Sequence, residues 1–178
     1  MLSVSSAYAQ IKISYGPYLQ NVKADEATIV WESDKNSVGW VELAPDDGTH
    51  FYGVERTKYF DTTNGVKNSS QLHAVKLEGL QPATTYRYRI YSMEVLSHEG
   101  TKVRYGDVAA TDVYNKKPLK FTTSDYSRQH ASFVMLNDIH GRSDIIPKLL
   151  RLADYQDKDF VVYNGDMVSI FSDKQSDS

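Results

Sequence analysis

Residues 80–92 read LQPATTYRYRIYS, and this stretch decides the fold of the first half of the chain. Pro82 sets a turn, because its ring fixes the backbone angle φ. The residues after the turn alternate in character, which is the period of a β-strand with one face in a core. One face of this strand holds Tyr86, Tyr88 and Ile90, and the other holds Arg87, Arg89 and Tyr91. We expect the tyrosines in the core or packed on a sheet face, and Arg87 and Arg89 in solvent.

Further short strands are predicted on both sides of this stretch. They are rich in β-branched and aromatic residues and are separated by turn signals such as Asn64-Gly65. The predicted strands are 26–33, 38–43, 71–77 and 118–122, with an inserted hairpin within 97–115. We expect Trp31 and Trp40 in the core, and Leu72 among the apolar residues of its strand. Many short strands with regular turns predict an all-β sandwich over residues 11–123.

The segment Leu80 to Tyr86 fits the pattern L-x-P-x-T-x-Y and resembles the E–F corner of fibronectin type III domains. In this corner a tyrosine packs its ring inward and returns its hydroxyl to the backbone a few residues upstream. The resemblance implies that Tyr86 is that tyrosine. It also implies a fibronectin type III-like β-sandwich.

After a polar linker, 124–130, the pattern changes from alternation to continuous apolar runs. Residues 131–136 and 160–163 are predicted as strands of the buried, parallel kind. Helical spacing of apolar residues predicts a helix over 143–155, with Ser143 as its N-cap and Pro147 in its first turn. The segment 131–178 is therefore predicted to begin a second, α/β domain.

Each of these two strands is followed by side chains that can bind a metal. Asp138-Ile139-His140 follows the first strand, and Gly165-Asp166 follows the second. The carboxyl ends of neighbouring parallel strands meet at one edge of a sheet, where open α/β sheets bind ligands. Carboxylates and imidazole are good ligands for zinc, iron and manganese. We therefore predict that Asp138, His140 and Asp166 are metal ligands.

This pair of motifs resembles the start of the motif series in calcineurin-like metallophosphoesterases, D-x-H and then G-D. A fibronectin-like domain in front of them is typical of the purple acid phosphatase branch. The resemblance implies that Asp138 and His140 bind a first metal ion and that Asp166 bridges it to a second. The metals implied are iron, zinc or manganese, and the implied reaction is two-metal hydrolysis of phosphate esters. Ser169 stands where that branch has an iron-binding tyrosine, so no tyrosinate–iron colour is expected.

The later motifs of the series, beginning with G-N-H, are missing from residues 1–178. We therefore expect these residues to be an inactive fragment of a larger phosphoesterase. The alternative is a binding or spacer module. Exposed aromatic residues clustered on one sheet face would favour this alternative. A nucleotide-binding α/β domain is disfavoured, because no glycine-rich phosphate loop follows either strand.

Composition narrows the functional classes. The net charge of −3 gives no basic face for nucleic acid, and the chain has no cysteine for disulfides or thiolate metal sites. No apolar run is long enough to span a membrane. Residues 1–10 include Ala7-Tyr8-Ala9, which fits a secretory cleavage site, so we interpret them as a signal-peptide remnant. We therefore expect a secreted or periplasmic protein, and the sequence leaves its substrate and oligomeric state open.

Overall fold

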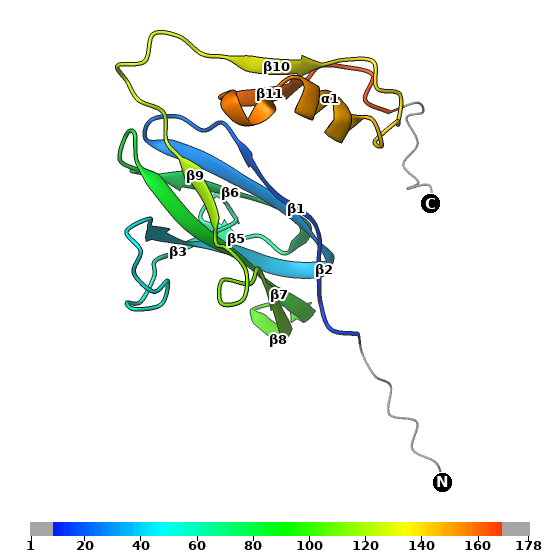
Figure 1. Ribbon diagram of the computed structural model, residues 1–178. Helices are drawn as coiled ribbons and strands as arrows, with labels where there is room; N and C mark the ends of the chain where they lie inside the picture. Colours follow the sequence, from blue (N-terminus) through cyan, green and yellow to red (C-terminus); the bar gives the residue numbers. More distant parts are fainter. Residues whose placement is uncertain (1–8, 169–178) are drawn as a thin grey trace. The chain divides into compact units, whose positions relative to one another are not determined.

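The computed structural model describes residues 9–168 of the chain (Figure 1). The chain divides into two compact units between Tyr126 and Ser127, inside the predicted linker. Of the signal-peptide remnant predicted at 1–10, residues 1–8 lie outside the described part, as does Ser169. No helix among the described residues is long and apolar enough to cross a membrane.

In residues 9–126, the described part of the first unit, the regular elements are all β-strands. The strands are β1 (Ile13–Gln20), β2 (Glu26–Pro45), β3 (Lys58–Phe60), β4 (Thr62–Thr63), β5 (Val66–Lys67), β6 (Ser70–Glu78), β7 (Thr85–Glu99), β8 (Lys102–Ala110) and β9 (Leu119–Thr122). All of the strand pairs in this unit are antiparallel. The β4–β5 hairpin turns through Asn64 and Gly65, which both have positive φ as a tight two-residue turn requires.

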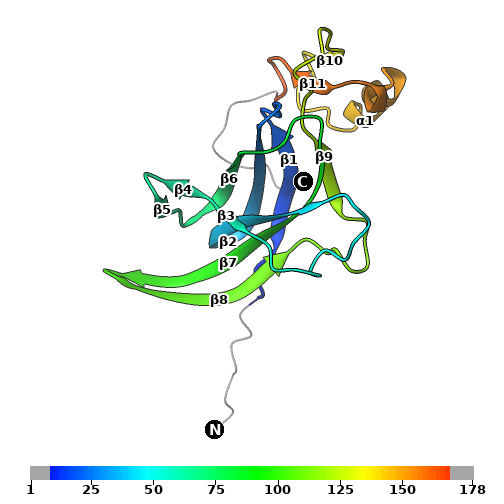
Figure 2. The same ribbon diagram turned by 90° about the vertical axis from the view of Figure 1, so that its left-hand side faces the viewer.

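The prediction of separate strands at 26–33 and 38–43 is wrong, because one continuous strand, β2, runs through both segments. The first part of β2 pairs with β1 and β6, and the second part pairs with β7 and β3. The register with β6 shifts between Glu32 and Ser37, where the strand passes from one set of partners to the other. A single curled sheet therefore forms both layers of the sandwich (Figure 2).

The core of the sandwich lies between these layers and draws on strands from both. Trp31 is fully buried there, and its Nε1–H donates a 2.9 Å hydrogen bond to Ser92 Oγ. Its other buried members are Ala27, Ile29, Val41, Val75, Leu77, Leu80, Tyr88, Ile90 and Phe121. The core thus contains Trp31, as predicted, and Tyr88 and Ile90 of β7. Trp40, also expected in this core, is buried on the outer face of the sheet instead, where it stacks on Tyr91. The prediction for Leu72 is wrong, because His73 turns inward in β6 and Leu72 is exposed.

The tyrosine corner is confirmed. The hydroxyl of Tyr86 accepts a 2.9 Å hydrogen bond from the backbone N–H of Gln81. Its ring stacks on Phe121 of β9, at a centroid distance of 5.6 Å. The inserted hairpin is also confirmed, because β7 and β8 continue together beyond the end of their contact with β2 and form a long projecting arm (Figure 2).

The second unit contains β10 (Phe133–Leu136), α1 (Ile146–Leu152), the 3₁₀ turn η1 (Tyr155–Asp157) and β11 (Phe160–Tyr163). Strands β10 and β11 pair in parallel, with Phe133 opposite Phe160 and Leu136 opposite Tyr163. The predicted strand–helix–strand order is therefore present.

The helix is shorter than the predicted span 143–155. Ile145 occupies the N-cap and no side chain caps the helix, so the prediction of a Ser143 cap is wrong. Residues 141–145 form successive turns instead, in which the N–H groups of Ser143 and Ile145 donate to carbonyls two and three residues earlier. The helix cannot extend to Tyr155, because Asp154 has a left-handed φ of 48°.

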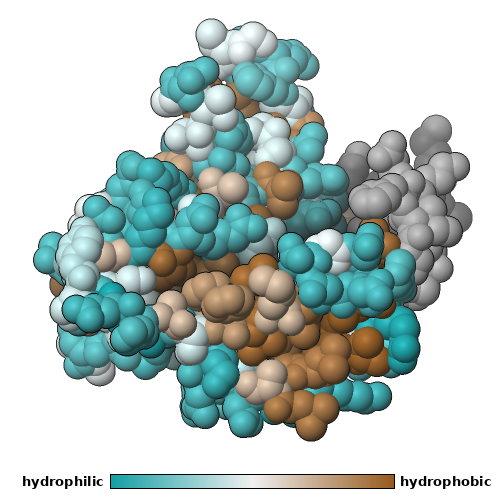
Figure 3. Space-filling model, turned by 90° about the horizontal axis from the view of Figure 1, so that it is seen from above, coloured by the Kyte–Doolittle hydropathy of each residue, from teal (hydrophilic) through white to brown (hydrophobic). Residues whose placement is uncertain are grey.

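Within residues 127–168, one face of the β10–β11 pair packs against the helix and the other is bare. Val134, Leu136 and Ile139 are buried against apolar residues of α1 such as Leu149. On the opposite face Phe133 and Met135 are exposed, and Phe133 stacks on Phe160 at 5.1 Å. The prediction of fully buried strands is therefore wrong for this face. Figure 3 shows brown, apolar side chains on the surface among teal, polar ones.

Candidate functional site

The predicted metal ligands lie in the two loops that leave the carboxyl ends of β10 and β11. Backbone hydrogen bonds hold these loops side by side. The N–H of His140 donates to the carbonyl of Asp166 and the N–H of Gly141 to that of Met167, both at 2.9 Å. The parallel pairing of the strands thus continues into the loops. The backbones of Asp138, His140 and Asp166 are neighbours for this reason.

All three residues have a left-handed backbone. The φ angles are 59° at Asp138, 49° at His140 and 47° at Asp166. This conformation costs an L-residue about 1–2 kcal/mol, and Asp and His tolerate it better than most. Strained residues of this kind cluster at functional sites, because surrounding structure must hold them in place. Here the inter-loop hydrogen bonds supply that support.

The side chains converge only in part. Nε2 of His140 lies 2.5 Å from Oδ1 of Asp138, and both side chains are open to solvent, at 55% and 73% exposure. Asp166 is exposed beside them in the neighbouring loop. Within residues 9–168, no group of three or more His, Asp or Glu side chains is close enough to hold a metal ion. The structure therefore brings Asp138 and His140 together as a carboxylate–imidazole pair and places Asp166 next to them by its backbone alone.

A second polar cluster, which the sequence analysis missed, is buried inside the sandwich. His73 of β6 is 0% exposed, and its Nδ1 lies 3.1 Å from Oδ2 of Asp61. On the other side of the ring, Nε2 lies 2.7 Å from Oγ of Ser37, which in turn is 2.9 Å from Oγ of Ser33. Asn68 completes the chain by donating from Nδ2 to Asp61 Oδ1 at 2.7 Å.

This cluster has the residue types of a hydrolytic triad, but it cannot act as one. Ser37 is fully buried, so no substrate can reach its hydroxyl. Burial lowers the pKa of His73, while the neighbouring Asp61 carboxylate opposes that shift. The cluster lies where β2 changes partners, since Ser33 and Ser37 are at the register shift with β6. A signal for it was present in the sequence, since His73 shares its strand face with Val75 and Leu77.

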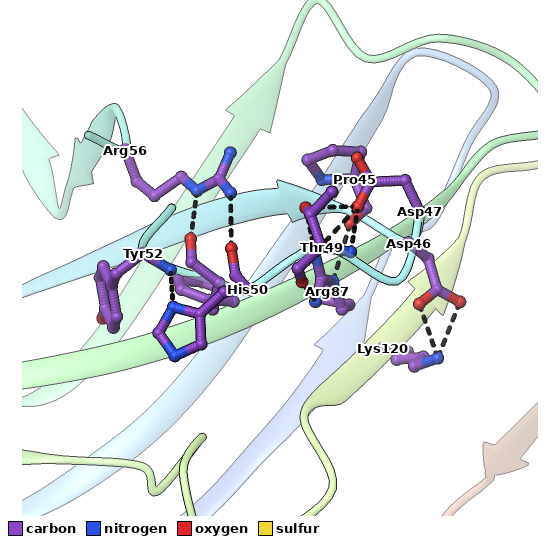
Figure 4. Close-up of polar contacts among 10 residues, drawn as sticks. Pro45, Asp46, Asp47, Thr49, His50, Tyr52, Arg56, Arg87 and Lys120 are labelled. Carbon is purple, nitrogen blue, oxygen red and sulfur yellow. Dashed lines mark hydrogen bonds and ion pairs between the residues drawn. The ribbon is translucent and has the colours of Figure 1, made fainter. Parts of the chain in front are cut away.

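The prediction that Arg87 and Arg89 lie in solvent on the outer face of the sandwich is wrong. Arg87 is only 7% exposed, and it donates to the carbonyls of Pro45 and Thr49 at 2.7 and 2.6 Å and to Asp47 at 3.2 Å (Figure 4). Arg89 is half-buried and donates to the carbonyl of Thr111. These arginines are therefore structural and do not form a solvated face, because the loop after β2 folds back over them.

The same face holds a cluster of aromatic side chains. If these rings were exposed, they would favour the alternative that the sandwich is a binding module. Trp40 and Tyr91 stack at a centroid distance of 4.7 Å, and Tyr91 donates a 3.0 Å hydrogen bond to Glu42. The rings of this cluster are Trp40, Tyr52, Tyr91 and Tyr114. Trp40 is buried, and of these four only Tyr114 is largely exposed, at 63%. These rings pack on one another, so the cluster offers no broad aromatic platform.

The described residues thus form a β-sandwich with a tyrosine corner, followed by a parallel strand pair with a carboxylate–imidazole pair in the loop after its first strand. Comparison with known proteins gives the family. Residues 10–123 match the family model described as "Purple acid Phosphatase, N-terminal domain", and the chain belongs to that family.

The comparison with curated proteins finds no match. Among solved structures, a computer-based redesign of a β-sandwich protein is similar at 18% identity, covering 65% of this chain and 97% of that chain, with a TM-score of 0.38.

Proposed function

We propose that this chain belongs to a phosphatase that hydrolyses phosphate esters with two metal ions. The observation that carries the proposal is the order of its parts. A purple acid phosphatase N-terminal domain at 10–123 is followed by D-x-H and G-D motifs at the ends of two strands that pair in parallel. On this proposal, residues 131–178 belong to the metallophosphoesterase domain.

The donor set fits iron, zinc or manganese, because carboxylate and imidazole are ligands that these metals accept. Asp138 and His140 bind the first ion on this proposal, and Asp166 bridges to the second. When bound, the ions activate water and stabilise charge on the phosphoryl group. The contact between His140 and Asp138 keeps the two side chains at one place.

The described residues supply only part of a two-metal ligand set, since no three of their His, Asp or Glu side chains form a cluster. We therefore propose that residues 1–178 bind metal weakly and do not turn over substrate, and that the other ligands come from the remainder of the phosphatase. The proposed substrate is a phosphate ester and not a nucleic acid. The proposed location is outside the cytoplasm, in keeping with the Ala7-Tyr8-Ala9 pattern.

The proposal is tested by paramagnetic broadening of amide resonances when Mn²⁺ is added to residues 1–178. We expect selective broadening in the loops 137–141 and 164–167. The Asp138→Asn variant should lose it. Asp144→Asn, which removes an exposed carboxylate a few residues away, should keep it. Broadening that is absent, or that survives Asp138→Asn, contradicts the ligand assignment.

Activity is tested separately with p-nitrophenyl phosphate and added manganese, zinc or iron. We expect no turnover above background from residues 1–178. Turnover at an ordinary enzyme rate, on the order of 1–10³ s⁻¹, contradicts the proposal that the ligand set is incomplete.

A further inference from the structure

The sandwich carries an open groove that the phosphatase proposal does not use. It lies between the beginning of β1, the end of β8 and the segment that leads into β9. Its volume is about 750 Å³, which is within the range of ligand-binding clefts. All of its walls come from the first unit, so the groove belongs to the sandwich alone.

The groove has an apolar floor and a basic rim. The apolar lining residues are Ile11, Ile13, Pro17, Val108, Ala109, Ala110 and Leu119. The exposed lysines of the rim are Lys12, Lys116 and Lys117, and among residues 9–168 none of them forms an ion pair.

The one carboxylate in the lining, Asp112, is occupied by its own turn. Its Oδ1 accepts the backbone N–H groups of Tyr114 at 2.8 Å and Asn115 at 3.0 Å. These bonds lower the pKa of Asp112, so it stays ionised, but the three lysines and Arg89 outnumber it. The groove is therefore locally positive, although the whole chain has a net charge of −3. A cleft lined by charge of one sign concentrates ligands of the opposite sign.

The groove also lies beside free strand edges. In the described part of the chain β8 pairs only with β7, and β1 pairs only with β2. An edge strand presents unpaired N–H and C=O groups that can accept a further strand. Pro17 in β1 has no N–H to offer, so the β8 edge at 108–110 is the better partner for a new strand.

We propose that this groove binds an extended acidic peptide segment of another protein by strand addition to β8. The backbone of the peptide pairs with β8, its apolar side chains face the floor of the groove, and its carboxylates meet Lys12, Lys116 and Lys117. Alternate side chains of an added strand point to opposite sides, which suits a peptide of alternating acidic and apolar residues. The absence of aromatic side chains from the lining argues against a sugar chain or a single-stranded nucleic acid, which stack on such rings.

The test uses the 178-residue chain and the synthetic peptide acetyl-TEVETEVE-amide, with binding followed by amide chemical shifts. We expect shifts at 108–111 and 116–119. The double variant Lys116→Glu with Lys117→Glu should weaken binding about tenfold or more. The matched control, Lys102→Glu with Lys148→Glu, makes the same charge change at exposed positions outside the groove and should bind as the wild type does.

A second peptide separates strand addition from simple charge attraction. It keeps every glutamate but carries proline at the valine positions, so it lacks the N–H groups of those residues. We expect it to bind at least about tenfold more weakly. Equal binding of the two peptides, equal weakening by the control variant, no binding of the first peptide, or preferred binding of heparin or an oligonucleotide overturns the proposal.

Discussion

The sandwich and the strand–helix–strand unit differ in how completely each buries its apolar side chains. In the sandwich, two layers enclose a core that includes Trp31 and Ile29. Within residues 127–168 of the second unit only Val134, Leu136 and Ile139 are buried, and Phe133 and Met135 face solvent. A parallel strand pair normally has both faces covered. The sandwich therefore contains its own stabilising core, while the candidate metal ligands sit on a unit with a much smaller one.

The largest expected difference in stability is between two side-chain truncations, one in each unit. Trp31→Ala removes a fully buried ring and should lower the free energy of unfolding by about 3–5 kcal/mol. Phe133→Ala removes a half-exposed ring that stacks on Phe160, and it should lower the same quantity by only about 0.5–1.5 kcal/mol. Urea unfolding followed by circular dichroism measures both. A large cost for Phe133→Ala would mean that the bare face is covered in solution.

The next largest effect is expected from Gly39→Ala. A Cβ at this position would lie 2.6 Å from Cγ of His73 and 2.7 Å from Cζ2 of Trp31. Overpacking of this kind costs about 1–3 kcal/mol. Gly53→Ala is the control, because its new Cβ approaches only the carbonyl of His50, at 3.3 Å. If both variants unfold at the same urea concentration, the packing around His73 is looser than described.

Acid should weaken the sandwich through His73. Burial lowers the pKa of this residue below the ordinary 6.5, so the unfolded chain binds the proton more readily. Stability is therefore complete above pH 6.5 and falls as the pH drops toward the lowered pKa. Denaturant midpoints followed by tryptophan fluorescence, between about pH 7 and pH 5, should fall more steeply in the wild type than in His73→Gln. Both tryptophans, Trp31 and Trp40, lie in the sandwich, so this signal reports on that unit.

The pH prediction is contradicted if the two slopes are equal. The other histidines remain in both proteins, so their titration cancels in the comparison. A lower overall stability of His73→Gln does not affect the result, because the slope and not the midpoint is compared.

The smallest effect is expected from Tyr86→Phe, which removes the hydroxyl that accepts from the N–H of Gln81. The ring and its stacking on Phe121 remain. The cost should be about 0.5–1.5 kcal/mol, toward the lower end because Gln81 is exposed and water can take the bond. Thermal unfolding measures it. A change of several kcal/mol would show that the corner also fixes the neighbouring strands.

Much of the fold could be predicted because short stretches of sequence indicate its strands and turns. Alternation and the proline turn led to β7, and the L-x-P-x-T-x-Y pattern led to the Tyr86 bond. The continuity of β2 could not be seen, because Asp34 to Ser37 looks like a turn in isolation. That segment is held as a strand by contacts with His73 and β7, which lie far along the sequence. The burial of Arg87 depends in the same way on a distant loop.

The candidate site was predictable in its placement and not in its side-chain geometry. The position of Asp138, His140 and Asp166 at one sheet edge follows from parallel pairing. Their left-handed backbone has no signature beyond the neighbouring Gly141 and Gly165. Side-chain convergence depends on which groups surround the loops, and neither spacing nor residue type contains that information.

The continuity of β2 has a consequence for how the sandwich comes apart. Since one strand belongs to both layers, neither layer can leave the other without disrupting the shared strand. Backbone amides in the two parts of β2 should therefore exchange with solvent deuterium in a single event, with one common opening free energy. The sandwich domain at residues 10–123 should therefore unfold as one cooperative unit under heat, denaturant or mechanical load.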